Sequence, residues 1–176
     1  MKSYSLKPPA TLKIVLDFLF LLLIVVTIFQ IILIGIILAH TEETFPFPVH
    51  PNFYEKIDIE AFVILLSNLL SRILFIYALF KFKQLISLFF KGIIYSIEQA
   101  KIISIIGKLI ILAAVLNSIP LFIYEHFLQE SPRTVTYNFG GVDSFWFLIA
   151  VGLFFMYLSQ VFNNARIMKE ENELTV

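Results

Sequence analysis

Four long apolar runs constrain this chain more than any other feature. They give predicted spans at residues 14–39, 61–80, 102–126 and 145–165. A helix needs about 20 apolar residues to cross roughly 30 Å of bilayer hydrocarbon, and each run approaches or exceeds that length. A backbone in lipid must satisfy its own hydrogen bonds, and barrel strands would be about half as long, so helices are predicted. The first run is too long for the apolar core of a signal peptide, so we expect it to remain as a span. The chain is therefore predicted to be an all-α integral membrane protein, a four-transmembrane-helix bundle forming one domain over residues 1–176.

Composition excludes several classes of function. Hydrophobic residues make up 59% of the chain and charged residues 15%, against roughly 45–50% and 25% in soluble domains. The formal net charge is zero, so direct binding of nucleic acid has no electrostatic support. Cysteine is absent, which excludes disulfides and thiolate chemistry. No phosphate-binding loop or nucleophile motif occurs, and the histidines lack metal-ligand spacing. We therefore expect a non-enzymatic protein without catalytic, cofactor or metal residues.

The distribution of lysine and arginine predicts the orientation in the membrane. Basic residues gather before the first span, in the loop 81–101 and after the fourth span, whereas the loops 40–60 and 127–143 together hold only Lys56 and Arg133. Segments rich in lysine and arginine stay in the cytoplasm. We therefore expect both termini and the loop 81–101 to be cytoplasmic (N-in/C-in), and the loops 40–60 and 127–143 to lie outside.

The predicted cytoplasmic loop carries helix signals of its own. Residues 81–91 continue span two as an amphipathic segment, which is expected to lie along the membrane interface. Gly92 is expected to end that segment. Ser96 and Gln99 have the spacing of a capping box, so a new helix is expected to open there and to enter the bilayer as span three.

Proline and small residues predict local features inside the spans. Pro120 is expected to kink the third span, with Asn117 and Ser118 placed to engage the backbone groups that it frees. Small residues recur four apart in 35–39 and in 114–118, a spacing that favours close helix contacts within the bundle or in a homo-oligomer.

Arg72 is the side chain whose position most needs an explanation. It lies nine residues before Lys81 and twelve after Glu60, about 13 Å and about 18 Å along a helix. An arginine at the centre of a membrane helix costs at least about 2.5–3.5 kcal/mol, so Arg72 is expected to face the bundle interior. The predicted intramembrane polar cluster consists of Asp17, Asn68, Arg72, Asn117 and Gln160.

Two interpretations of this cluster stay open. In the first, Asp17 and Arg72 form a buried ion pair, bridged by an amide side chain, that fixes helix register. In the second, the cluster is a polar pathway or anion site, and the protein is a small transporter or channel subunit with a polar seam around Arg72. Ser67 and Ser71 are spaced for close helix contact beside Arg72 in either case.

Several stretches of the chain resemble a known family. They are Phe90-Lys91-Gly92, Ser96-Ile97-Glu98-Gln99-Ala100-Lys101, Ile106-Gly107, Gln160-Val161-Phe162 and the ending Glu171-Asn172-Glu173-Leu174-Thr175-Val176. In these stretches the chain resembles the bacterial four-span membrane family catalogued as domain of unknown function 2975. The resemblance covers nearly the whole chain. It implies the fold and a location in the bacterial cytoplasmic (inner) membrane, and it implies no established activity.

The resemblance also implies a partner besides the lipid bilayer. Genes of such proteins often lie beside one for a small helix-turn-helix regulator, which implies a membrane partner or sensor for a cytoplasmic transcriptional regulator. The C-terminal tail is a candidate docking segment, and the alternative is that it is only the solvated end of the fourth helix. Its candidate docking residues are Lys169, Glu170, Glu171, Glu173 and Leu174.

Overall fold

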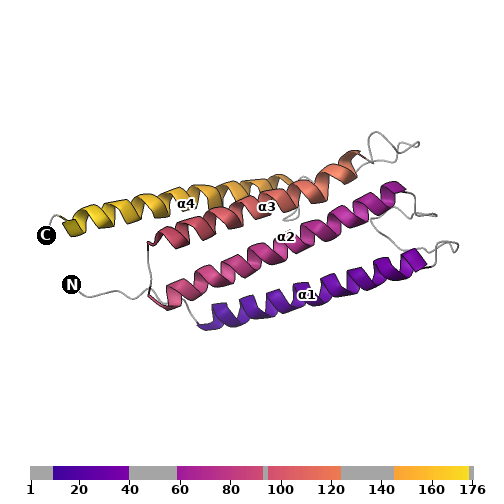
Figure 1. The fold of residues 1–176 in the computed structure, drawn as a ribbon, viewed down its shortest axis with the longest axis horizontal. Helices are drawn as coiled ribbons and strands as arrows, with labels where there is room; N and C mark the ends of the chain where they lie inside the picture. The colour runs from indigo at the N-terminus through magenta and orange to yellow at the C-terminus, as the bar shows by residue number, and fades with distance from the viewer. Residues whose placement is uncertain (1–9, 40–58, 93–94, 124–144, 175–176) are drawn as a thin grey trace.

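The computed structural model describes residues 10–39, 59–92, 95–123 and 145–174. In this part of the chain all regular structure is helical (Figure 1). The helices are α1 (Ala10–Ala39), α2 (Ile59–Phe90), α3 (Ile97–Ile123) and α4 (Phe145–Leu174). Each is long and apolar enough to cross a membrane. The predicted all-α fold with four spanning helices is thereby confirmed. The predicted outer loops lie outside the described residues, apart from residues 59–60, which belong to α2. The last residues of the predicted third span, 124–126, also lie outside them.

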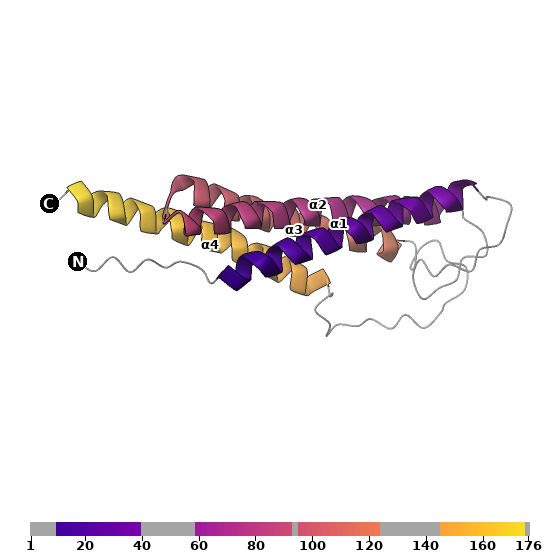
Figure 2. The same ribbon diagram turned by 90° about the horizontal axis from the view of Figure 1, so that it is seen from below.

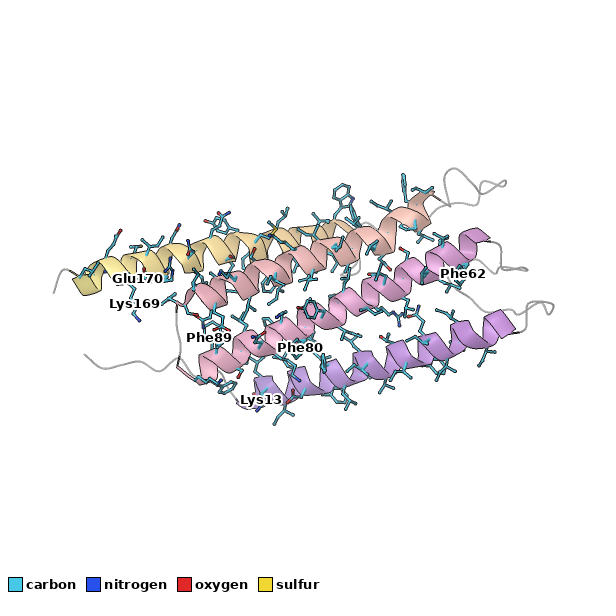
Figure 3. All side chains as sticks on the ribbon, viewed as in Figure 1. Lys13, Phe62, Phe80, Phe89, Lys169 and Glu170 are labelled. Atoms are coloured by element: carbon cyan, nitrogen blue, oxygen red, sulfur yellow. The ribbon has the colours of Figure 1, made fainter. Side chains whose placement is uncertain are left out.

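One end of the molecule carries most of the lysines. The starts of α1 and α3 and the ends of α2 and α4 lie at this end (Figure 1). Lys13, Lys169 and Glu170 lie at this end, whereas Phe62 lies near the other (Figure 3). We call it the basic end. It is defined by Lys13, Lys83, Lys101 and Lys169.

The core joins α2, α3 and α4. Its buried aliphatic residues come from α2 and α3 and are Ala78, Leu85, Leu88, Ile102, Ile103, Ile106 and Ile110. Aromatic rings of α2 and α4 meet edge to face, Phe82 with Phe155 at 6.3 Å and Phe89 with Phe162 at 6.1 Å between centroids. Because lipid is as apolar as these side chains, close packing rather than the hydrophobic effect holds such a core together.

The amphipathic segment after span two was predicted to lie along the membrane interface, and this prediction is wrong. The segment continues α2 without a break to Phe90, and its Leu85 and Leu88 are buried in the core. The reason is that α3 turns back along the same face of α2. The apolar side of the segment is therefore covered by protein instead of headgroups.

The turn between α2 and α3 follows the predicted signals. The backbone of Gly92 has a positive φ of 75°, and its N–H donates to the carbonyl oxygen of Phe89 at 3.0 Å. The N–H of Ser96 donates to Gln99 Oε1 at 3.1 Å, and the N–H of Gln99 donates to Ser96 Oγ at 3.2 Å. Both the end of α2 at Gly92 and the capping box that opens α3 are confirmed.

α1 lies outside the three-helix core. It packs against α2, where the rings of Phe20 and Phe80 lie 6.5 Å apart. In Figure 2, α1 and α4 each cross α2 and α3 obliquely. Only 6% of the apolar window of α1 is buried. In a bilayer, lipid or another chain therefore covers most of this helix.

α4 is shifted toward the basic end relative to α3. Gly107 and Gly152 meet where the two helices cross, and Ser159 Oγ donates to the carbonyl oxygen of Ala100 at 2.7 Å. With this register, residues 163–174 extend beyond the start of α3 (Figure 1). The extension amounts to about three turns, or about 18 Å at 1.5 Å per residue. At the opposite end, α4 begins only partway along α3.

Candidate functional site

Asp17 pairs with a lysine instead of Arg72. Its Oδ1 lies 2.6 Å from Lys83 Nζ, and that Nζ also lies 4.6 Å from the ring centroid of Phe20. Asp17 is near the start of α1, level with the basic end of α2. Arg72 is eleven residues from Lys83, about 16 Å farther from that end. The predicted Asp17–Arg72 pair is therefore wrong, because the two side chains lie at different depths.

Arg72 and Asn117 do come together. Both line a cavity of about 260 Å³ to which all four helices contribute. Its remaining lining residues are Leu23, Ser71, Phe75, Ile110, Ala113, Ala114 and Leu148. Arg72 and Asn117 are both exposed in the isolated chain. Arg72 thus faces a cavity between the four helices, in line with the predicted bundle interior, but its side chain is exposed there. The reason is that α1 stands apart from the core and α4 begins at this level, so neither helix covers the side chain.

The charge of Arg72 has no counterion in the described part of the protein. Neither its guanidinium nor the Asn117 amide forms a hydrogen bond or ion pair with another described residue. The Ser71 hydroxyl is already engaged, because it donates to the carbonyl oxygen of Ala113 at 2.8 Å. A charge at this depth is unfavourable by at least about 2.5–3.5 kcal/mol, so a negatively charged group in the cavity would be stabilised.

Two serines fix α2 against α3 beside this cavity. Pro120 has no N–H, so the carbonyl oxygen of Leu116 lacks its helical donor. Ser67 Oγ of α2 donates to that oxygen. Ser71 makes the equivalent bond one turn along, to Ala113. The predicted close contact at these serines is confirmed, and it sets the positions of the two polar side chains in the cavity.

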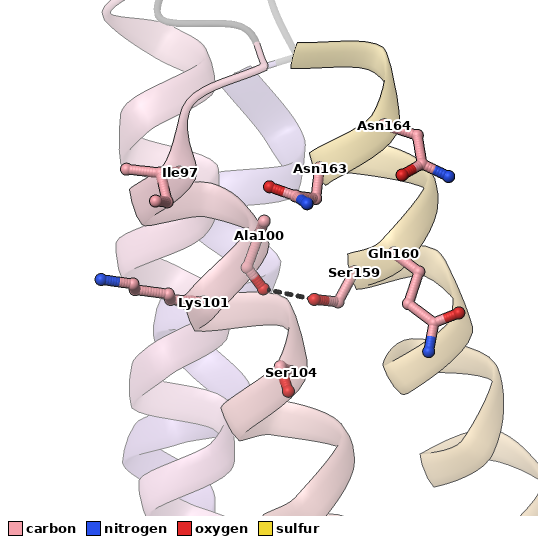
Figure 4. A pocket seen from close by; sticks show the side chains of 8 residues that line it. All are labelled: Ile97, Ala100, Lys101, Ser104, Ser159, Gln160, Asn163 and Asn164. Carbon is pink, nitrogen blue, oxygen red and sulfur yellow. Dashed lines mark hydrogen bonds between the residues drawn. The ribbon is translucent and has the colours of Figure 1, made fainter. Parts of the chain in front are cut away.

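Gln160 lies in a different place. It lines a cavity of about 500 Å³ between the start of α3 and α4 near the basic end (Figure 4). Ser159 and Asn163 point toward α3, whereas Gln160 and Asn164 point away from it (Figure 4). The remaining lining residues are Ile97, Ala100, Lys101 and Ser104. Polar and apolar groups contribute about equally to the surface of this cavity, and the polar ones are one lysine and several amides and hydroxyls.

The five predicted residues therefore do not form one cluster. Arg72 shares a cavity with Asn117, Gln160 lines the other cavity, and Asp17 belongs to an ion pair. Asn68 is partly buried one turn from Arg72 and lines neither cavity. The physical reason is the register between helices, which separates residues that the span boundaries alone would place at overlapping depths.

The candidate docking residues lie on the part of α4 that extends beyond α3. Lys169, Glu170, Glu171 and Leu174 are exposed, and Glu173 is helical with a side chain outside the described set. The Arg166 guanidinium binds the Glu170 carboxylate at 2.9 Å, one helical turn away. Sequence reasoning missed two exposed apolar side chains on this extension, Ile167 and Met168. The one-turn spacing of Arg166 and Glu170 was the signal that the helix continues this far.

The comparison with protein families agrees with the fold. A family model described as a protein of unknown function (DUF2975) matches residues 5–176. The chain belongs to the DUF2975 family. This confirms the resemblance seen in the sequence, and the four apolar helices make the DUF2975 protein a multi-pass membrane protein. No curated protein and no solved structure matches the chain.

The described part of this DUF2975 protein contains no group of three or more His, Cys, Asp or Glu side chains that could hold a metal ion. The three histidines at positions 40, 50 and 126 lie outside the described residues. Family membership brings no activity with it. The two cavities and the extended end of α4 are therefore the features that can indicate a function.

Proposed function

We propose that this DUF2975 protein is a non-enzymatic membrane partner of a cytoplasmic helix-turn-helix regulator. It resides in the bacterial inner membrane with both chain ends in the cytoplasm, and the end of α4 is its docking surface. The observation that carries the proposal is the extension of α4, residues 163–174, beyond α3. Met168 is 63% exposed there and Leu174 is 87% exposed, between charged neighbours. Apolar side chains gathered on a charged, projecting helix are typical of a surface that contacts another protein.

The charge of the extension supports a DNA-binding partner. Glu170, Glu171 and Glu173 place three carboxylates within four residues, against the two positive charges of Arg166 and Lys169, so the extension carries a small excess of negative charge. A DNA-binding protein presents lysine and arginine to phosphates, so its DNA-binding face is complementary to this acidic helix end. Docking there would hold the regulator at the membrane and would compete with its binding to DNA.

Recovery of the regulator from detergent extracts tests the proposal. The full-length protein is expected to recover a helix-turn-helix regulator encoded beside its gene, as the family resemblance implies. Deletion of residues 169–176 is expected to abolish recovery without loss of membrane insertion. Reversing two charges, Glu170→Lys with Glu171→Lys, should lower recovery at least about tenfold, and added salt should lower it in the unmodified protein.

The matched control is Glu98→Lys, a single charge reversal at an exposed position near the basic end, in the first turn of α3. It should leave recovery unchanged. Normal recovery after both the deletion and the double reversal would contradict docking on α4. No recovery of the regulator by the unmodified protein would contradict the proposed function as a whole.

A second function, a small transporter or channel subunit, is favoured by one observation. Arg72 and Asn117 line the same cavity within the spans. Four spans enclose too little space for a wide pore, so such a subunit would act as a homo-oligomer. It predicts that Arg72→Leu ends a flux measured in liposomes while the protein still folds. An unchanged flux in a folded Arg72→Leu protein would contradict it.

A further inference from the structure

The cavity around Arg72 has the composition of a ligand site. Most of its wall is apolar, including Leu23, Phe75 and Leu148 from three different helices. Its free hydrogen-bond donors are the Arg72 guanidinium and the Asn117 amide, since the Ser71 hydroxyl already donates to α3. A mostly apolar cavity with a few convergent polar groups is the usual form of a small-molecule site.

The depth of Arg72 favours a negative partner. Arg72 lies ten residues beyond Phe62, the start of the apolar part of α2, which is about 15 Å along the helix. An arginine side chain keeps its positive charge in proteins. Asp17 is the acidic residue of α1, and its ion pair with Lys83 holds it toward the basic end, away from Arg72. The described helices therefore supply no carboxylate at this depth.

We infer that this cavity binds an amphipathic oxyanion, a single negatively charged oxygen group on an apolar chain. The planar guanidinium of Arg72 matches a carboxylate or phosphate with two parallel hydrogen bonds, and the Asn117 amide adds a third donor. The chain of the ligand lies against the apolar wall. A volume of about 260 Å³ is close to the lower limit of ligand sites, so it accepts the head and a short length of chain. Because one arginine supplies one positive charge, the ligand is a monoanion. This site does not depend on the docking of a regulator.

Titration of the unmodified protein with three eight-carbon probes is the first test. The full-length protein in phosphatidylcholine nanodiscs is titrated with octanoate, octan-1-ol and octylammonium by isothermal calorimetry. Octanoate is expected to bind saturably, and the neutral and cationic probes at least about tenfold more weakly, because a hydrogen bond to a charged group is the stronger kind. Equal affinity for octanoate and octan-1-ol, or no saturable binding of octanoate, would overturn the inference. This comparison needs no variant, so a folding defect cannot obscure it.

Variants then locate the site. Arg72→Gln is expected to weaken octanoate binding at least about tenfold, whereas Lys81→Gln removes a positive charge from the same helix outside the cavity and should leave binding unchanged. Leu148→Trp keeps the arginine and fills the cavity from α4. It should abolish binding with unchanged helix content by circular dichroism. Undiminished binding in a folded Arg72→Gln or Leu148→Trp protein would overturn the inference.

Lipid composition separates the two natural sources of such an oxyanion. If phosphatidylglycerol added to the nanodiscs competes with octanoate, the inference is supported with an anionic lipid head group as the occupant. If octanoate affinity is unchanged by that lipid, the inference is supported with a free carboxylate as the occupant. A second copy of the chain covering Arg72 would overturn it, and would appear as an octanoate-insensitive dimer that Arg72→Gln dissociates.

Discussion

Three serine hydroxyls donate hydrogen bonds to backbone carbonyl oxygens of α3. Ser67 and Ser71 donate from α2, and Ser159 donates from α4. In lipid these bonds connect helices that gain little from the hydrophobic effect. The bond from Ser67 has a special role, because Pro120 deprives the Leu116 oxygen of its own donor. Asn117 and Ser118 of the same helix were predicted to serve that oxygen, and the neighbouring helix supplies the donor instead.

This pairing predicts that Ser67 and Pro120 are energetically coupled. Ser67→Ala is expected to lower the free energy of unfolding by about 1 kcal/mol, because the Leu116 oxygen is then left without a donor. In the Pro120→Ala background the loss should be smaller, since residue 120 regains an N–H. The free energy of unfolding is measured in mixed micelles titrated with sodium dodecyl sulfate. The four proteins compared are the unmodified protein, Ser67→Ala, Pro120→Ala and the double variant. Ser118→Ala is the control, and equal losses in both backgrounds would contradict the coupling.

At the scale of the elements, one glycine pair sets how α3 and α4 cross. A Cβ added at Gly107 would lie 2.5 Å from the carbonyl oxygen of Gly152. Neither backbone can yield without separating the helices. Gly35 in α1, by contrast, has no atom within 4 Å of an added Cβ. The same residue type therefore carries a packing constraint at one position and none at the other.

Gly107→Ala is accordingly predicted to be destabilising, and Gly35→Ala to be neutral or slightly stabilising. The first forces α3 away from α4 and should lower the free energy of unfolding by about 1–3 kcal/mol. The second adds a methyl group in open space and improves helix propensity. Both are measured by the same micelle titration. Similar stabilities for the two variants would show that the helices do not meet at Gly107.

The elements also show what the sequence could and could not reveal. Helix positions, the glycine that ends α2 and the capping box at Ser96 were predictable because each signal lies within a few residues of its effect. The partner of Asp17 was not predictable, because the register of α1 on α2 depends on contacts between distant parts of the chain. The shift of α4 likewise depends on the contact of Gly107 with Gly152, two glycines that no spacing rule connects.

For the molecule as a whole, the basic end combines lysines, the cavity near Gln160 and the extended end of α4. The opposite half contains the Arg72 cavity, where α4 begins and α3 is less covered. This difference between the two ends of the molecule follows from the shift of α4. It separates the proposed docking surface at one end from the proposed site within the spans. The docking proposal therefore depends on which face of the membrane the basic end occupies, whereas the proposed site at Arg72 does not.

The absence of native cysteine makes that orientation directly measurable. Lysine-rich segments resist transfer across the membrane, so the basic end is predicted to stay in the cytoplasm. A single cysteine is introduced as Lys91→Cys, as Asn172→Cys or, in the loop 40–60, as Asn52→Cys. In intact cells a membrane-impermeant thiol reagent should label only Asn52→Cys, and after permeabilisation it should label all three. Labelling of Asn172→Cys in intact cells would place the end of α4 outside, where no cytoplasmic regulator could reach it, while leaving octanoate binding at Arg72 untouched.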